Sequence, residues 1–423
     1  MLPARPAGTG CPNVQFLQWH DERHRVEDSG WRGLGRDASF RSMTTVSGET
    51  NRRDSLALVL TGGGARAAYQ VGVLRAIAER FPDLQIQILT GVSAGALNML
   101  YLASHPGPFR QAVEGLGREW LRLTPRRVYA VRPLDIGRAV VRWIVNMVLR
   151  RGPPQPSLHG LMDVSPLRGF LASAMNVDGV QRNIETGRLR AAALSATRYD
   201  TGETITFVQA APDVPVWERY MRIAVRTRID VRHLMASAAI PLVFPAVKLD
   251  DGFYGDGSVR QTAPLAPAIH LGATRIIGVA MRARTTPAPR AVPMDQYPVA
   301  AEVFGLLLHS VFLDTLDADA ERLERINALL RALPDPTAGP GDMRLVDLLL
   351  LRPSRDLGDL VRDRAVRLPR MVQLLVSSIG GERTRSSDLL SYLMFQPEYI
   401  GVLMELGYDD TRKRMPEVEA FLS

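Results

Sequence analysis

The sequence contains one cysteine, Cys11, and only two lysines, Lys248 and Lys413, among its 423 residues. A single cysteine excludes an intramolecular disulfide framework and a cysteine-ligated zinc site. No apolar run reaches the roughly 18 residues that a membrane-spanning helix needs, and the N-terminus lacks a basic region followed by an apolar one. The sequence therefore predicts neither an integral membrane protein nor a secretory signal peptide.

Almost all of the basic charge is arginine. The chain has 52 basic and 44 acidic residues and a formal net charge of +8. Together with frequent alanine, glycine and proline, this bias indicates a GC-rich coding sequence, as in many bacteria. A basic chain can bind nucleic acid or an anionic membrane, or simply carry a solvated basic face.

Residues 1–54 show neither a helical nor a strand period. This predicts a disordered leader, or an over-extended gene start with Met43 as the initiator. Because the first buried strand is expected from Leu56, removal of the leader is expected to leave activity unchanged.

Two apolar strands, 56–60 and 86–89, each run into a glycine-rich turn and then into a helical pattern. This alternation is typical of an α/β fold with a parallel sheet. Further elements are expected along the chain: strands at 190–197, 204–208, 275–281 and 345–351, and helices at 263–270 and from Val299 onward.

The second glycine turn, Gly91–Gly95, has the pattern Gly-x-Ser-x-Gly. Between a strand and a helix, this pattern exposes a serine hydroxyl on a tight turn and points a helix N-terminus at developing negative charge. Ser93 is therefore a candidate nucleophile. The alternative interpretation is a structural turn in which Ser93 only caps the helix.

The first glycine turn leads into a helix through Gly-Gly-Gly-Ala-Arg at residues 62–66. Its backbone N–H groups can surround a phosphate or the oxyanion of an acyl-transfer intermediate. A dinucleotide site expects an acidic residue after the second strand, and that strand instead leads to Ser93. A phosphate-binding loop ends in Gly-Lys-Ser/Thr, which is absent here. The sequence favours an oxyanion hole.

The third motif is an aspartate between two glycines, at residues 254–258 (Tyr-Gly-Asp-Gly-Ser). Alone it indicates no more than a turn. A serine nucleophile needs a base, however, and the seven histidines follow no pattern that predicts one. Asp256 is therefore the candidate base, although a carboxylate with its ordinary pKa of about 4 is a weaker base than imidazole.

Taken together, these motifs resemble the patatin-like phospholipases. Three further stretches strengthen the resemblance: 193–202, 236–245 and 391–393. The resemblance implies a three-layer α/β/α patatin-like fold with a mainly parallel sheet and a helical C-terminal extension. It implies a catalytic domain over 55–285, with a basic helical insertion over about 110–185, and a mainly helical region over 286–423 packed on that domain.

The resemblance also implies the site. Ser93 would be the nucleophile and Asp256 the proton acceptor, and no metal or organic cofactor is required. The implied oxyanion hole is Gly62, Gly63, Gly64, Ala65 and Arg66, and the supporting motif glycines are Gly91, Gly95 and Gly257. Two positions depart from the family pattern: Ala67 replaces a glycine, which matters if the position needs a positive φ, and Ser258 replaces glycine or alanine.

The implied function is a serine acyl hydrolase, a phospholipase A or lysophospholipase that releases fatty acids from lipid esters through an acyl-enzyme. Two alternatives stay open: a catalytically idle interaction protein on the same fold, and a nucleotide binder. No nucleic-acid partner is expected. The protein is predicted to be cytoplasmic or peripheral on the inner face of a bacterial membrane.

The segment 134–150 predicts an amphipathic helix with Arg138, Arg142 and Arg150 on one side. One interpretation is a helix that lies in the membrane interface, with these arginines on anionic head groups. The other is a core-packed helix with a solvated arginine face.

Overall fold

A ten-stranded sheet runs through the part of the chain that the structure describes. The computed structural model describes residues 55–130, 162–241, 243–283, 310, 315–334, 343–362 and 391–423. In chain order the strands are β1 (Leu56–Leu60), β2 (Ile88–Val92), β3 (Ala191–Arg198), β4 (Thr204–Ala210), β5 (Glu218–Arg219), β6 (Arg222–Arg226), β7 (Val247–Leu249), β8 (Gly252–Asp256), β9 (Arg275–Val279) and β10 (Asp347–Leu351). All six predicted strands are confirmed, as β1, β2, β3, β4, β9 and β10, with ends shifted by up to three residues.

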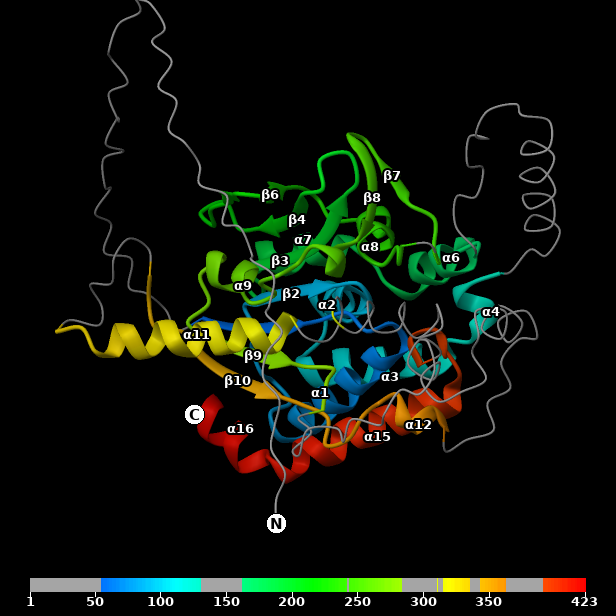
Figure 1. Ribbon diagram of the computed structural model, residues 1–423. Helices are drawn as coiled ribbons and strands as arrows, with labels where there is room; N and C mark the ends of the chain where they lie inside the picture. Colours follow the sequence, from blue (N-terminus) through cyan, green and yellow to red (C-terminus); the bar gives the residue numbers. More distant parts are fainter. Residues whose placement is uncertain are drawn as a thin grey trace, which may run out of the picture. The chain divides into compact units, whose positions relative to one another are not determined.

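The strand order is β10-β9-β1-β2-β3-β4-β6-β5, and a β7-β8 hairpin branches from β3 (Figure 1). All pairs from β10 to β3 are parallel, whereas β3 pairs with β4 and with β8 in antiparallel orientation. The predicted mainly parallel sheet is therefore confirmed. The carboxyl ends of its parallel strands lie along one edge, which is where ligands bind in open α/β sheets.

Helices cover both faces of this sheet. In chain order the helical segments are η1 (Gly64–Ala67), α1 (Ala68–Arg80), α2 (Ala94–Ser104), α3 (Phe109–Arg122), α4 (Pro125–Val128), α6 (Ser165–Ala174), α7 (Asp178–Glu185), α8 (Val231–Ser237), η2 (Gly257–Val259), α9 (Ala266–His270), α11 (Thr315–Arg331), α12 (Asp359–Arg362), α15 (Pro397–Lys413) and α16 (Met415–Leu422). The helix expected from Val299 onward corresponds, within the described residues, to α11. The three-layer α/β/α architecture is confirmed.

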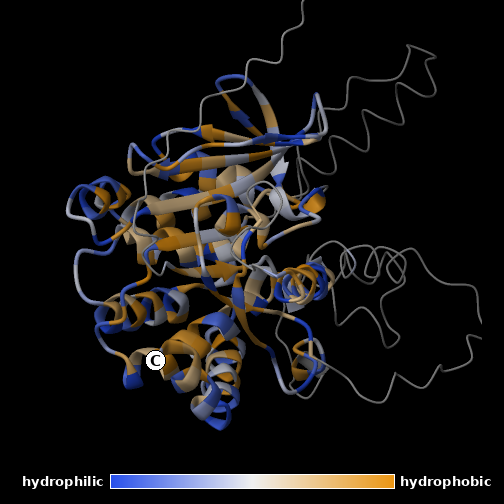
Figure 2. Ribbon diagram, turned by 90° about the vertical axis from the view of Figure 1, so that its left-hand side faces the viewer, coloured by the Kyte–Doolittle hydropathy of each residue, from blue (hydrophilic) through white to orange (hydrophobic). Residues whose placement is uncertain are grey.

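The central strand β1 shows how two cores arise from one sequence. Side chains alternate between the faces of a strand, so Leu56, Leu58 and Leu60 pack into a core with α1, α2, α3 and α15. Ala57 and Val59 face the opposite core, which α9 and α11 complete. In Figure 2 the strands are mainly orange, and blue residues lie mostly on helix surfaces and turns.

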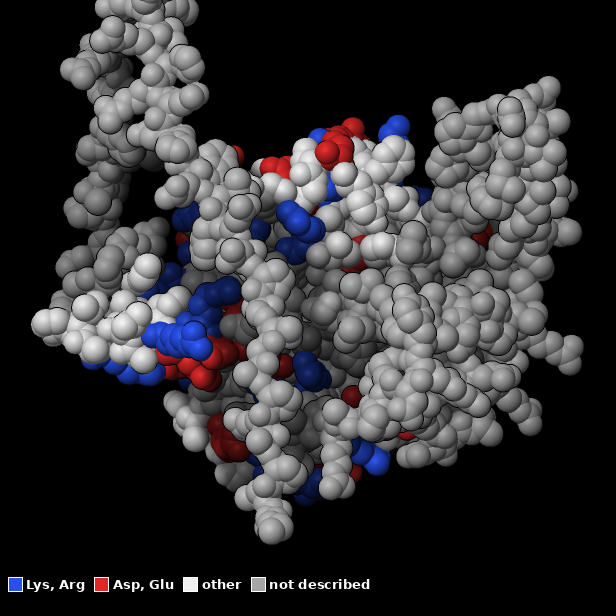
Figure 3. All heavy atoms as spheres, in the orientation of Figure 1, with Lys and Arg blue, Asp and Glu red and all other residues white. Residues whose placement is uncertain are grey.

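Basic and acidic side chains lie next to one another over α11 (Figure 3), where Arg322 pairs with Asp319 at 3.2 Å and Arg331 with Asp347 at 3.6 Å. Among the described residues, no helix combines the length and the apolar composition that a bilayer span requires.

Candidate active site

The candidate nucleophile lies on the turn between β2 and α2. Ser93 has φ 53° and ψ −130°, a backbone conformation that side-chain-bearing residues rarely adopt and that is common at functional turns. A Cβ at Gly95 would lie 2.2 Å from the Leu60 carbonyl oxygen. Gly95 is therefore needed because β1 passes directly beside this turn, which places β1 and its glycine loop next to Ser93.

A second serine holds the backbone of Ser93. The Ser93 N–H donates to Ser237 Oγ at 2.9 Å, and the Ser237 hydroxyl donates to the Ser195 carbonyl at 2.7 Å. Ser237 is the last residue of α8 and is completely buried. No local motif predicts a role for Ser237, although it lies in the stretch 236–245 that contributed to the family resemblance.

The candidate base lies at the end of β8. The Ser93 hydroxyl donates to Asp256 Oδ2 at 2.6 Å, and the Ser258 N–H donates to Asp256 Oδ1 at 2.9 Å. Antiparallel pairing places Asp256 opposite Ala196 of β3, and the Thr197 hydroxyl donates to the Asp256 carbonyl at 2.9 Å. Ser93 and Asp256, which are 163 positions apart in the sequence, are thus in direct contact.

Complete burial changes the chemistry of this carboxyl. Loss of hydration raises the pKa of Asp256 from 3.8 to about 7, and the hydrogen bonds from Ser93 and Ser258 offset this only in part. Close to neutral pH, such a carboxylate is matched to act as a general base. The sequence had suggested an ordinary, weaker base, because burial is not visible in a motif.

The described histidines have other contacts. His105 accepts a hydrogen bond from the Gly107 N–H at 3.0 Å, and His270 stacks on Trp217. His233 contacts Asp230 at 2.8 Å and lies edge-on to a phenylalanine ring. Within the described chain, Ser93 and Asp256 meet without a histidine between them.

The glycine loop turns directly into η1. The Arg66 N–H donates to the Gly63 carbonyl at 3.1 Å, whereas no acceptor in the described residues takes the N–H of Gly63, Gly64 or Ala65. Gly64 has φ +55°, and a Cβ there would lie 2.3 Å from the Tyr392 carbonyl oxygen. Three backbone donors are therefore available beside the turn that carries Ser93, and glycine is required at the second of them.

Ala67 has φ −64° and ψ −9°. These are ordinary helical values, so this departure from the family pattern introduces no strain. The Ser258 departure leaves the backbone contact with Asp256 in place, because that contact uses the Ser258 N–H.

Arg66 connects the loop to the C-terminal part of the chain. Its side chain is only 1% exposed. Its Nε donates to Ser391 Oγ at 2.7 Å, and its guanidinium lies 4.6 Å from the centroid of the Tyr392 ring. Arg66 thus holds the loop against residues 391–392.

The patatin-like phospholipase family model matches residues 58–269, which is half of the chain. The protein belongs to this family. The matched range contains the glycine loop, Ser93 and Asp256. No curated protein sequence matches the chain.

Solved patatin-fold structures align over most of this chain at low identity. Human GIVD cytosolic phospholipase A2, in complex with methyl γ-linolenyl fluorophosphonate, is 14% identical over 87% of this chain and 58% of its own, with a TM-score of 0.43. VipD from Legionella pneumophila is 11% identical over 86% and 66%, with a TM-score of 0.31. The Pseudomonas aeruginosa type III effector ExoU is 13% identical over 83% and 53%, with a TM-score of 0.30. The patatin-like chain thus spans 53% to 66% of these three proteins.

Two predictions fall on other parts of this patatin-like chain. The leader 1–54 and the amphipathic segment 134–150, with Arg138, Arg142 and Arg150, lie outside the described residues.

Proposed function

We propose that this protein is a serine acyl hydrolase that releases fatty acids from lipid esters, in the manner of a phospholipase A or a lysophospholipase. The observation that carries the proposal is the 2.6 Å contact between Ser93 Oγ and Asp256 Oδ2, inside the range that matches the patatin-like family. The N–H groups of Gly63, Gly64 and Ala65, which have no acceptor among the described residues, support it, because acyl transfer requires donors for the oxyanion.

The proposed reaction has two halves. In the first, Asp256 accepts the Ser93 hydroxyl proton while Ser93 Oγ attacks the ester carbonyl carbon. The N–H groups of Gly63, Gly64 and Ala65 stabilise the oxyanion. The C–O bond to the alcohol then breaks, and the alcohol leaves with the proton from Asp256. In the second half, Asp256 takes a proton from water, hydroxide attacks the acyl-serine, and the fatty acid leaves as Ser93 regains its proton.

A lipid panel tests this proposal. The purified full-length protein is incubated with phospholipid, lysophospholipid and triacylglycerol, and free fatty acid is measured by mass spectrometry. We expect release from at least one class, and loss of that release after treatment with a fluorophosphonate. Protein that hydrolyses none of the three and is not modified by the fluorophosphonate would instead be an idle protein on this fold.

The rate is expected to follow the ionisation of Asp256. Because only the carboxylate can accept the Ser93 proton, kcat/KM should fall about tenfold per pH unit below about pH 7. The measurement is the initial rate with a soluble short-chain ester from about pH 4.5 to about pH 9. With an aspartate of ordinary pKa, the rate would stay unchanged as the pH falls to about 5. That result would contradict the assignment of Asp256 as the base.

A further inference from the structure

The hairpin that carries Asp256 is joined to the sheet by a short ladder. Its strand β8 pairs with β3 through three residues, Tyr254, Gly255 and Asp256. On its other side β8 pairs only with β7, again through three residues. A two-stranded hairpin is marginally stable by itself. The Asp256 N–H also donates to the Ala239 carbonyl at 2.9 Å, and the position of the strand before Asp256 depends further on what fastens this hairpin to β3.

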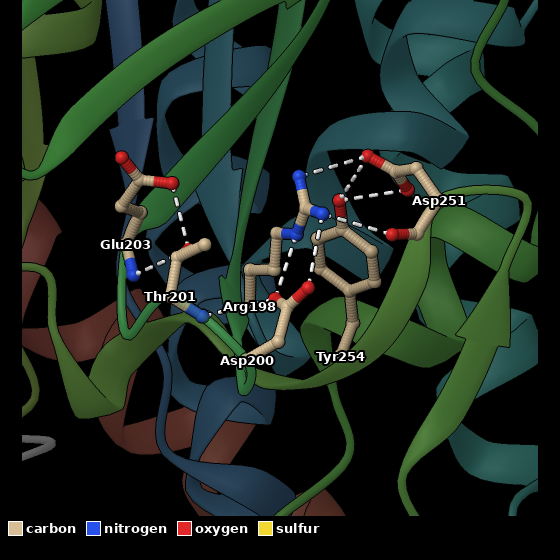
Figure 4. A network of polar contacts seen from close by, with 6 residues as sticks. All are labelled: Arg198, Asp200, Thr201, Glu203, Asp251 and Tyr254. Carbon is tan, nitrogen blue, oxygen red and sulfur yellow. Dashed lines mark hydrogen bonds and ion pairs between the residues drawn. The ribbon is translucent and has the colours of Figure 1, made fainter.

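Arg198, the last residue of β3, makes such a connection (Figure 4). Its guanidinium binds the carboxylate of Asp200 through Nε at 2.7 Å and Nη2 at 3.0 Å. It also donates from Nη2 to the Asp251 carbonyl at 2.9 Å and from Nη1 to Asp251 Oδ2 at 3.4 Å. One side chain thus joins the turn that follows β3 to the turn between β7 and β8.

Asp251 extends this connection to the core. The Tyr254 hydroxyl lies 3.0 Å from both carboxylate oxygens of Asp251, and Figure 4 shows Asp251 in contact with both that phenol and the guanidinium of Arg198. Tyr254 is fully buried, and its ring centroid lies 5.6 Å from that of Phe207. Because Tyr254 pairs with Arg198 and precedes Asp256 by two residues, the contacts hold the strand directly before the carboxyl group.

We propose that Arg198 is a positioning residue for the reaction: by fastening the β7–β8 hairpin to β3, it holds Asp256 against Ser93 and away from water. This inference rests on the proposed function for its kinetic consequences, but the positioning itself is a property of the fold.

The environment of Asp256 makes the loss of this contact measurable. Asp256 faces the Ser93 hydroxyl and the Ser258 N–H. The pKa of Tyr199, which follows β3, is raised by burial and, to a smaller extent, by the charge of Asp256. No charged side chain of the described residues contributes to the pKa of Asp256, which is raised by burial. A hairpin that moves outward admits water and so returns this pKa towards its ordinary value.

The test compares Arg198→Gln with Arg190→Gln. Arg190 lies at the other end of β3 and forms an exposed ion pair with Asp213 at 2.8 Å, so it controls for the loss of a paired surface arginine. We expect Arg198→Gln to lower kcat by about tenfold to hundredfold and to move the midpoint of the kcat/KM profile down by about one pH unit, with KM little changed. Arg190→Gln should behave like the wild type.

The same shift can be read without any reaction. Titration of the Asp256 carboxyl by 13C NMR, assigned with Asp256→Asn, should give a lower pKa in Arg198→Gln than in the wild type or in Arg190→Gln. This measurement separates the two proposals, because it reports the positioning even if no lipid is hydrolysed. Should Arg198→Gln fail to fold, Arg198→Lys, which keeps the charge but not the planar fork, should give an intermediate shift. A wild-type kcat and an unchanged Asp256 titration in either folded variant would overturn the proposal.

Discussion

Asp256→Asn is expected to abolish ester hydrolysis and, at about pH 8, to make the fold more stable than the wild type. The amide cannot accept the Ser93 proton, so general-base catalysis is lost. The amide oxygen can still accept the Ser258 N–H, which now binds Oδ1 at 2.9 Å, and the amide NH2 can donate to Ser93 Oγ. The substitution therefore preserves the contacts while it removes the buried charge.

The stability difference should depend on pH. The pKa of Asp256 is raised from 3.8 to about 7 in the fold. The contribution of Asp256 to the free energy of unfolding is therefore fully present below about pH 4 and is lost as the pH rises through about 7. A shift of about three units corresponds to at most about 4 kcal/mol at high pH. Asparagine does not ionise and escapes this loss.

Denaturant unfolding of both proteins at about pH 8 and about pH 5 measures this difference. Asp256→Asn should be the more stable at the higher pH, and its advantage should shrink at the lower one. The matched control is Asp213→Asn, which changes an exposed aspartate and should give no gain. A variant that is less stable than the wild type at both pH values would show that ionisation of the buried Asp256 carboxyl does not destabilise the wild-type fold.

Ser93→Ala and Ser93→Gly are both expected to lose all hydrolysis, because neither has a hydroxyl to form the acyl-enzyme. Their stabilities should differ. At φ 53° and ψ −130° alanine keeps the backbone strain of about 1–3 kcal/mol, whereas glycine relieves it. Glycine loses about 0.5–1 kcal/mol more chain entropy on folding, so the net gain should be about 1 kcal/mol.

Denaturant unfolding of the two inactive variants provides this comparison under one buffer condition. Ala96, which is buried inside the helix α2, supplies the control position, since Ala96→Gly should be less stable than the alanine that it replaces. If Ser93→Gly is also the less stable of its pair, the turn at Ser93 is not strained in the way that its backbone angles indicate.

The sequence predicted the parts of this site that depend on short motifs. The turn 91–95 predicted a serine between a strand and a helix, and residues 254–258 supplied the aspartate that lies beside it. The expected exposure of that serine was wrong, because Ser93 is only 2% exposed. The strand β1 was predicted with its observed ends, because a continuous apolar run before three glycines has few other interpretations. These features depend on neighbouring residues, and such patterns are visible in one sequence.

Features that depend on long-range contacts were missed. Ser237 holds Ser93 across 144 positions, and nothing local to residue 237 indicates this. The β7–β8 hairpin is short and partly exposed, so it carries no strong apolar alternation. Helix α3 lies in the stretch predicted as a basic helical insertion, but that prediction did not include its packing against the core, which its buried residues Ala112, Leu116 and Trp120 indicate by recurring every four positions.

The most direct test of the Ser93–Asp256 pair is the isolation of its acyl-enzyme. The protein is mixed with a lipid ester that carries an isotopically labelled acyl chain, quenched in acid, digested and examined by mass spectrometry. We expect the label on Ser93 and no labelled peptide from Asp256→Asn in the same time. A label on a different residue, or labelling of Asp256→Asn at the wild-type rate, would contradict the assignment of this pair.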